Sequence, residues 1–131
     1  MRYYIDTSVL VAYALEGDPN HKKAVEIISS LNPGSEKVIS SLTLAELYSV
    51  FSRRVGELEG KALVKYLLRR GDVSLVDVDF NLVFRKLELA WRAKLKTLDL
   101  LHLIISNLLG AEMITLDEEL REAFTKLNEF G

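Results

Sequence analysis

Residues 2–18, RYYIDTSVLVAYALEGD, set one carboxylate between two apolar runs. Residues 3–5 have the composition of a buried strand, and residues 8–15 that of a short helix. Asp6 therefore falls where a strand gives way to a helix, at the rim of the core. Aspartate is depleted in strands and at their buried ends, so this acid needs a specific role.

The rest of the chain alternates between strand and helix periodicity. We expect further strands at residues 37–40, 73–79 and 112–116, and helices at 22–31, 43–55, 60–70, 80–94, 97–109 and 117–127. Such alternation predicts parallel pairing through right-handed crossovers, with helices on both faces of the sheet. No repeat or linker divides the 131 residues, so we expect a single domain over 1–131.

Composition narrows the class of protein. The formal net charge is -2, so a nucleic acid would have to be bound through a local basic patch or a metal ion. The absence of cysteine excludes disulfides and thiolate metal sites and fits a reducing cytoplasm. No apolar run approaches the roughly 20 residues that span a bilayer, and the start lacks a signal-peptide pattern. We expect a cytoplasmic protein without membrane contact.

Three further acids belong to the same edge of such a sheet as Asp6. Glu46 lies early in the helix after strand 37–40. Asp99 lies in the first turn of the helix that feeds strand 112–116, and Asp117 ends that strand. The carboxyl ends of parallel strands share one edge, where ligands bind in the crevice outside them. The sequence therefore predicts that these four acids meet.

Each acid also has a purely structural explanation. Asp6 and Asp117 could cap the helices that follow them. Asp99 follows Thr97, a candidate N-cap, and could complement the helix dipole. Glu46 lies opposite an apolar stripe and, taken alone, would be a solvated glutamate. The conjunction of the four is more informative than any single member.

His102 follows Asp99 by three residues in an otherwise almost wholly apolar helix. It could orient that acid, although a hydrogen-bonded core histidine is the commoner role. Four carboxylates in one crevice repel each other unless a cation lies among them. Magnesium and manganese prefer oxygen ligands, whereas His21 and His102 are poorly spaced for zinc. A carboxylate-held Mg²⁺ or Mn²⁺ suits phosphoryl chemistry.

The motifs around the four acids resemble those of the PIN domain family, in particular the VapC type of toxin ribonuclease. They are DTSVLV at Asp6, TLAEL at Glu46, LDLLHL at Asp99 and ITLDEEL at Asp117. Their order and spacing agree over nearly the whole chain. The resemblance implies a three-layer α/β/α sandwich around a parallel sheet of four to five strands. The family often has a short fifth strand after the last helix, which the ending LNEFG leaves absent or truncated.

The resemblance also implies Mg²⁺- or Mn²⁺-dependent endonucleolytic cleavage of RNA. Carried over by position, Asp6 and Asp99 are the main direct ligands of the ion. Asp117 and Glu46 complete the site directly or through water.

Two hydroxyl residues and two partners follow from the same resemblance. Thr115 matches the family's hydroxyl position, and Ser8 supports the first acid in a similar way. Proteins of this type are usually homodimers held by a small antitoxin protein that threads a segment into the acidic site.

A basic run follows the helix of Glu46 and would form a phosphate track for RNA. Its members are Arg53, Arg54, Lys61 and Lys65, and Arg69 and Arg70 continue it. A solvated helix face is the commoner origin of such a run. Tyr66 and its apolar neighbours are expected to build core, and any left exposed would form a groove for an antitoxin helix.

Several other functions remain open at this stage. An RNA-processing nuclease, or a PIN-like module that binds without cleaving, would use the same acids. A phosphoacceptor signalling domain is disfavoured because Thr7 and Ser8 follow Asp6, where a second acid is required, and because no lysine lies next to the last strand, at ITLDEEL. A phosphatase of the haloacid-dehalogenase type would need an aspartate at Ser8. A dinucleotide-binding domain would need a G-x-G-x-x-G motif after the first strand, which is missing.

Overall fold

The computed structural model describes residues 1–129 as alternating strands and helices. The elements are β1 (Arg2–Ile5), α1 (Thr7–Ala14), α2 (His21–Ser30), β2 (Glu36–Ser40), α3 (Ser41–Arg54), α4 (Glu57–Arg69), β3 (Val73–Val76), α5 (Phe80–Ala90), α6 (Thr97–Leu108), β4 (Glu112–Ile114) and α7 (Glu118–Glu129).

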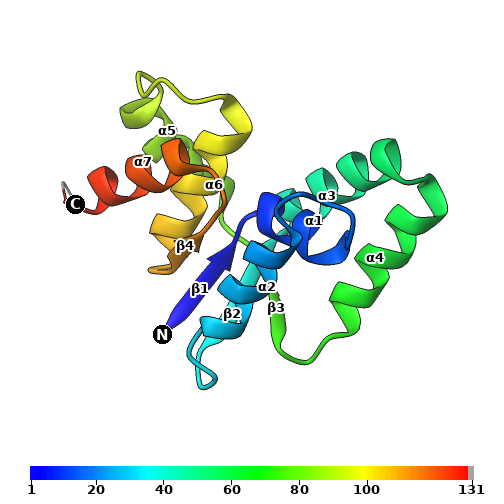
Figure 1. Cartoon of the computed structure of the whole chain (residues 1–131). Coiled ribbons are helices and arrows are strands. Elements are labelled where there is room, and N and C mark those ends of the chain that lie inside the picture. The colour runs from blue at the N-terminus through cyan, green and yellow to red at the C-terminus, as the bar shows by residue number, and fades with distance from the viewer. Residues whose placement is uncertain (130–131) are drawn as a thin grey trace.

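The four strands of residues 1–129 form one parallel sheet in the order β3-β2-β1-β4. Helices cover both faces of this sheet (Figure 1). The predicted three-layer α/β/α sandwich is therefore confirmed. Helix α7 extends through residues 127–129, the first part of the segment considered for a fifth strand, and residues 130 and 131 lie outside the described part.

Alternation along β1 separates the two halves of the core. Tyr4 faces one side with Val38 and Met113, against α5, α6 and α7. Tyr3 and Ile5 face the other side, against α1 and α2. This is the period of two that a strand buried on both faces requires. Helix α6 is almost wholly apolar because it is buried in the first of these layers. No helix within residues 1–129 has the length and apolarity needed to span a bilayer.

The central position of β1 places Asp6 between its neighbours. Tyr4 lies opposite Val38 of β2 and Met113 of β4. The Asp6 N–H donates to the Ile114 carbonyl at 2.9 Å, so the ladder continues one residue beyond the strand. The Asp6 side chain is thereby fixed at the carboxyl edge of the sheet.

Several local predictions were wrong at element ends. Helix α4 begins at Glu57 rather than residue 60, and β4 ends at Ile114 rather than residue 116. Strand β3 ends at Val76 rather than residue 79, because the Asp79 carboxylate accepts the Asn81 N–H at 2.7 Å and caps α5. Helix α5 ends at Ala90 rather than residue 94. The N-cap of α6 is Lys96, so Thr97 is the first helical residue and not the cap.

Candidate active site

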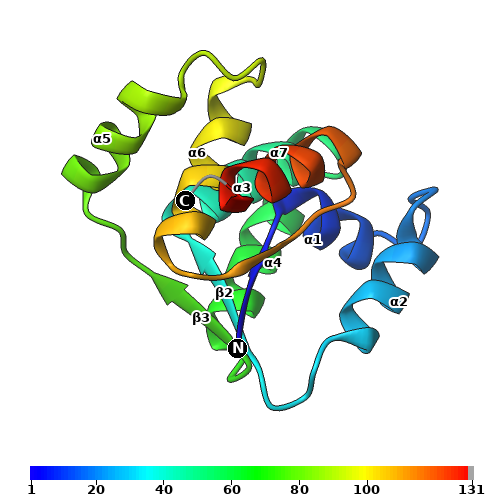
Figure 2. The ribbon, with the colours of Figure 1, turned by 90° about the vertical axis from the view of Figure 1, so that its left-hand side faces the viewer.

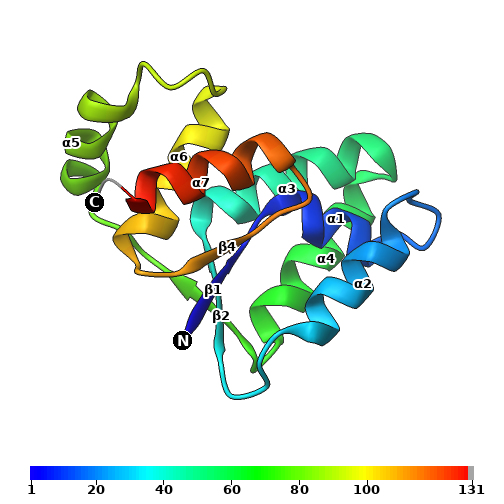
Figure 3. The ribbon, with the colours of Figure 1, turned by 60° about the vertical axis from the view of Figure 1, so that its left-hand side comes forward.

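All four predicted acids line one cavity of about 340 Å³ at the carboxyl edge of the sheet. Figure 3 shows the chain leaving β4 and reaching the start of α7 beside the start of α1. Asp6 and Asp117 come from these two junctions, Glu46 from α3 and Asp99 from the first turn of α6. The parallel topology therefore gathers side chains that lie up to 111 residues apart in the sequence.

Two hydroxyls hold the Asp6 carboxylate. Asp6 is only 6% exposed, and its Oδ2 accepts from Ser8 Oγ at 2.7 Å and from Thr115 Oγ1 at 2.9 Å. Its side chain makes no capping bond to α1, although Asp6 occupies the N-cap position. Within residues 1–129, Oδ1 accepts no hydrogen bond. One carboxylate oxygen is thus anchored, and the other is free for a ligand.

The same hydroxyls bind the end of β4. Thr115 Oγ1 accepts the Asp117 N–H at 3.0 Å, and Ser8 Oγ accepts the Leu116 N–H at 3.2 Å. The Asp117 carboxylate caps α7, since Oδ1 accepts the backbone N–H groups of Glu119 at 3.0 Å and Leu120 at 3.3 Å. Capping engages Oδ1 alone and leaves Oδ2 available at the cavity.

Glu46 is held by a buried histidine. His102 is completely buried, and its Nε2 lies 3.0 Å from Glu46 Oε1. Its Nδ1 lies 2.7 Å from the Tyr4 hydroxyl, which also contacts Ser40 Oγ at 2.9 Å and Thr43 Oγ1 at 3.2 Å. A carboxylate accepts, so Nε2 carries the proton and Nδ1 accepts from Tyr4. Burial raises the pKa of Tyr4 to about 12, so its hydroxyl remains a donor.

The surroundings of Glu46 and Asp99 shift their pKa values in opposite directions. The hydrogen bond from His102 holds the pKa of Glu46 below its ordinary value, although burial acts in the opposite direction. The pKa of Asp99 is raised, first by burial and then by the negative charges of Asp6, Asp117 and Glu46. The ionised form of Asp99 is therefore disfavoured beside the other acids, and a cation in the cavity would stabilise it.

The donor set fits a hard divalent cation. Asp6, Glu46 and His102 present atoms within 4.8 Å of one another. Both nitrogens of His102 are engaged, however, so the free donors around the cavity are carboxylate oxygens, the kind that Mg²⁺ and Mn²⁺ prefer. The Thr7 hydroxyl is 95% buried, lies beside Glu46 and lines the cavity, and it has no hydrogen-bond partner within residues 1–129. A buried hydroxyl left unpaired marks a position for water or ligand.

The sequence did not predict two contacts at the site, although Arg54 itself was expected beside the acids. Tyr4 was expected only as a strand residue, and its part in holding His102 has no local signal. Arg54 lines the cavity as an ion pair with Asp18, with Nη2 and Oδ2 2.9 Å apart. The pKa of Asp18 is lowered by the Asn20 N–H and then by Arg54.

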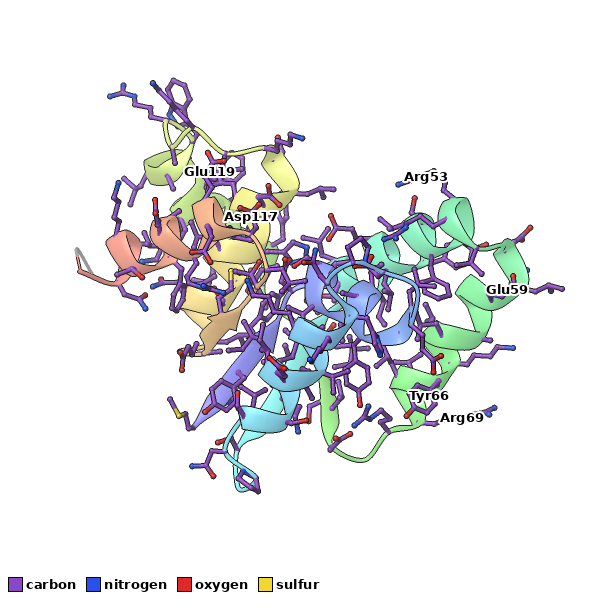
Figure 4. All side chains as sticks on the ribbon, in the orientation of Figure 1. Arg53, Glu59, Tyr66, Arg69, Asp117 and Glu119 are labelled. Atoms are coloured by element: carbon purple, nitrogen blue, oxygen red, sulfur yellow. The ribbon has the colours of Figure 1, made fainter. Side chains whose placement is uncertain are left out.

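The predicted basic run is divided between paired and unpaired side chains. Arg54 pairs with Asp18, and Lys61 lies 3.1 Å from Glu57. Arg53 donates to Ser49 and lies toward the far end of α3, away from Asp117 (Figure 4). Lys65 is exposed. A continuous phosphate track through these four residues remains a prediction.

Comparisons with known proteins place this architecture in a family. The family model of the PIN domain matches residues 3–124, and the chain belongs to that family. The fold is similar to VapC20 of Mycobacterium tuberculosis, a toxin described as cleaving the sarcin–ricin loop. The TM-score is 0.80 at 22% identity, over 92% of this chain and 94% of that chain.

Two toxin–antitoxin structures show the same fold. VapBC-1 of nontypeable Haemophilus influenzae has a TM-score of 0.71 at 18% identity, over 96% of this chain and 94% of that chain. VapBC2 of Rickettsia felis, bound to a DNA fragment of its promoter, has a TM-score of 0.66 at 18% identity, over 93% and 92%. No curated protein matches the chain significantly.

Proposed function

We propose that this protein is a metal-dependent endoribonuclease and the toxin of a toxin–antitoxin pair, acting in the cytoplasm. The observation that carries the proposal is the cavity in which four carboxylates from separate segments meet. Membership of the PIN domain family supports it. The similar folds of VapC20 and VapBC-1 support the toxin role.

Asp6, Asp99 and Asp117 would hold the Mg²⁺ or Mn²⁺ ion. When bound, the ion polarises a phosphate oxygen and lowers the pKa of water. Ser8 and Thr115 fix the orientation of the Asp6 carboxylate through Oδ2, so Oδ1 is free to bind the ion and the carboxylate does not have to rotate.

Glu46 is the group we assign to accept the proton of the attacking water. His102 binds Oε1 and leaves Oε2 free, and the same hydrogen bond lowers the pKa of Glu46 so that it is ionised before reaction. Asp117 is the alternative acceptor. Attack by water on the phosphodiester leaves a 5′-phosphate and a 3′-hydroxyl, without participation of the ribose 2′-hydroxyl.

Partners follow from the same proposal. We assign a small antitoxin as partner, on the support of solved toxin–antitoxin complexes with this fold. An apolar pocket of about 60 Å³ between α1 and α4, partly walled by Leu63, Tyr66 and Leu67, would receive one apolar side chain of its helix. Tyr66 is 56% exposed, so the expectation that it builds core was wrong. A homodimer is the proposed assembly.

The test compares Asp6→Asn with Asp77→Asn, a matched control at an exposed acid between β3 and α5. Wild type and the control should cleave RNA with Mn²⁺ and lose activity on chelation, whereas Asp6→Asn should be inactive. The ends should carry 5′-phosphate. Equal cleavage by all three proteins, or 2′,3′-cyclic phosphate ends, would contradict the proposal.

A further inference from the structure

Residues 85–96, which end α5 and connect it to α6, carry an unneutralised positive charge. The segment contains five cations and one acid, Glu88. The cations are Arg85, Lys86, Arg92, Lys94 and Lys96. Among the side chains that the structure describes, none of the five forms an ion pair. Arg54, Lys61 and Arg70, in contrast, are all paired with carboxylates.

The same segment exposes the single tryptophan of the sequence. Trp91 is 61% exposed, and the Arg92 guanidinium lies 5.3 Å from its ring centroid. An indole exposed to water lacks the favourable free energy of burying its large apolar surface, and packing against α5 or α6 does not supply it here. Exposed aromatic residues among cations are the composition of surfaces that bind single-stranded nucleic acid.

The end of this segment leads into the helix that carries one of the cavity's acids. Lys96 is the N-cap of α6, and Asp99 follows in the first turn of that helix. In Figure 1 the connection stands above the start of α6, and Figure 2 shows α5 on the side of the molecule opposite α2. A chain that carries a net charge of -2 and an acidic cavity repels phosphates, so it needs cations beside the cavity.

We propose that residues 91–96 bind the RNA strand next to the cleaved bond. An unpaired base stacks on Trp91, and Arg92, Lys94 and Lys96 contact the flanking phosphates. Stacking requires a base that is free of a duplex, so the bound strand is single-stranded or locally splayed. The cleavage step rests on the proposed nuclease function, whereas the binding step does not. A second protein copy is the alternative occupant, since Leu89 is 83% exposed in the same segment, and the titration below separates the two.

Trp91 makes binding directly measurable, because no other residue contributes tryptophan emission. A single-stranded RNA of mixed sequence, titrated at low salt with chelator present, should quench the fluorescence to saturation. The same sequence as a duplex should quench it far less. Equal quenching by the duplex would overturn the stacking assignment. Emission that shifts with protein concentration and not with RNA would show that a second copy covers the tryptophan, and would overturn it too.

Matched variants test the contribution of the aromatic ring. Trp91→Ala should raise the Kd for labelled single-stranded RNA about 5-fold or more, the range expected for one base stacked on one aromatic ring. Tyr66→Ala is the control. Tyr66 is 56% exposed beneath the Arg70 guanidinium, at the opposite end of the molecule from the α5–α6 connection (Figure 4). It should leave the Kd unchanged, and an unchanged Kd for Trp91→Ala would overturn the proposal.

A second pair tests the phosphate contacts. Arg92→Gln should reduce the magnitude of the salt slope of log Kd by about 0.7, the value for one single-strand phosphate contact. Arg2→Gln, at an arginine that begins β1 on the sheet edge opposite the cavity, should not. Manganese-dependent cleavage by the wild type is measured in parallel. Cleavage with an unaltered KM in Trp91→Ala would overturn this inference and leave the nuclease intact. Trp91-dependent binding without cleavage would support this inference and refute the nuclease.

Discussion

Removing the Tyr4 hydroxyl tests the network that holds Glu46. Tyr4 is completely buried, and phenylalanine fills the same space without creating a cavity. The substitution leaves His102 Nδ1 buried without a donor, which costs about 1–3 kcal/mol. Ser40 and Thr43 keep their reciprocal capping bonds, with Ser40 N–H 3.2 Å from Thr43 Oγ1, so they add little. Tyr4→Phe should therefore lower the free energy of unfolding by about 1–3 kcal/mol.

Urea denaturation at neutral pH measures this change, provided that the m-value stays constant. Tyr3→Phe is the matched control. Tyr3 is the preceding residue of β1, 8% exposed, and its hydroxyl makes no hydrogen bond within residues 1–129. The control should remain within about 0.5 kcal/mol of the wild type. In a His102→Leu background, Tyr4→Phe should cost less, because the unpaired nitrogen is gone. A loss for Tyr4→Phe no larger than for Tyr3→Phe would refute the network.

Three further predictions concern the acids and the ion. Asp99→Asn should stabilise the metal-free protein at neutral pH. Because the pKa of Asp99 is raised, the wild type loses stability as the pH rises above the ordinary pKa of 3.8. Thermal melts at several pH values in chelator should show this loss in the wild type and not in the variant. Mn²⁺ at 100 times its Kd should raise the stability of the wild type by about 2.7 kcal/mol, and an equal shift in Asp6→Asn would count against the site. His102→Leu should raise the pKa of Glu46. Because the pKa of Glu46 is lowered, its ionised form stabilises the fold above the ordinary pKa of 4.5, and this stabilisation disappears as the pH falls. The variant should lack part of it, and an NMR-monitored titration of Glu46 measures the change in pKa. An unchanged Glu46 titration would show that the hydrogen bond has no effect.

The sequence predicted the type of every element, and the errors fell at their ends. Periodicity extends over many residues, whereas a boundary depends on one side chain, as at Asp79, where a capping bond ends an apparent strand. Parallel alternation also predicted the shared edge of the four acids, since it requires no knowledge of strand order. The order β3-β2-β1-β4 was not predictable from periodicity alone.

What the sequence determined by itself is the fold class and the edge at which Asp6, Glu46, Asp99 and Asp117 meet. Only the tertiary structure decided which group holds which acid. His102 was expected as a hydrogen-bonded core histidine, with Asp99 as a possible partner three residues away. It is buried and hydrogen-bonded, but its carboxylate partner is Glu46, which is 56 residues away. Backbone preferences and periodicity arise between neighbours in the sequence. The partner of a buried side chain depends on how whole layers pack, and that packing brings the Glu46 side chain of α3 to His102 of α6, one turn after Asp99.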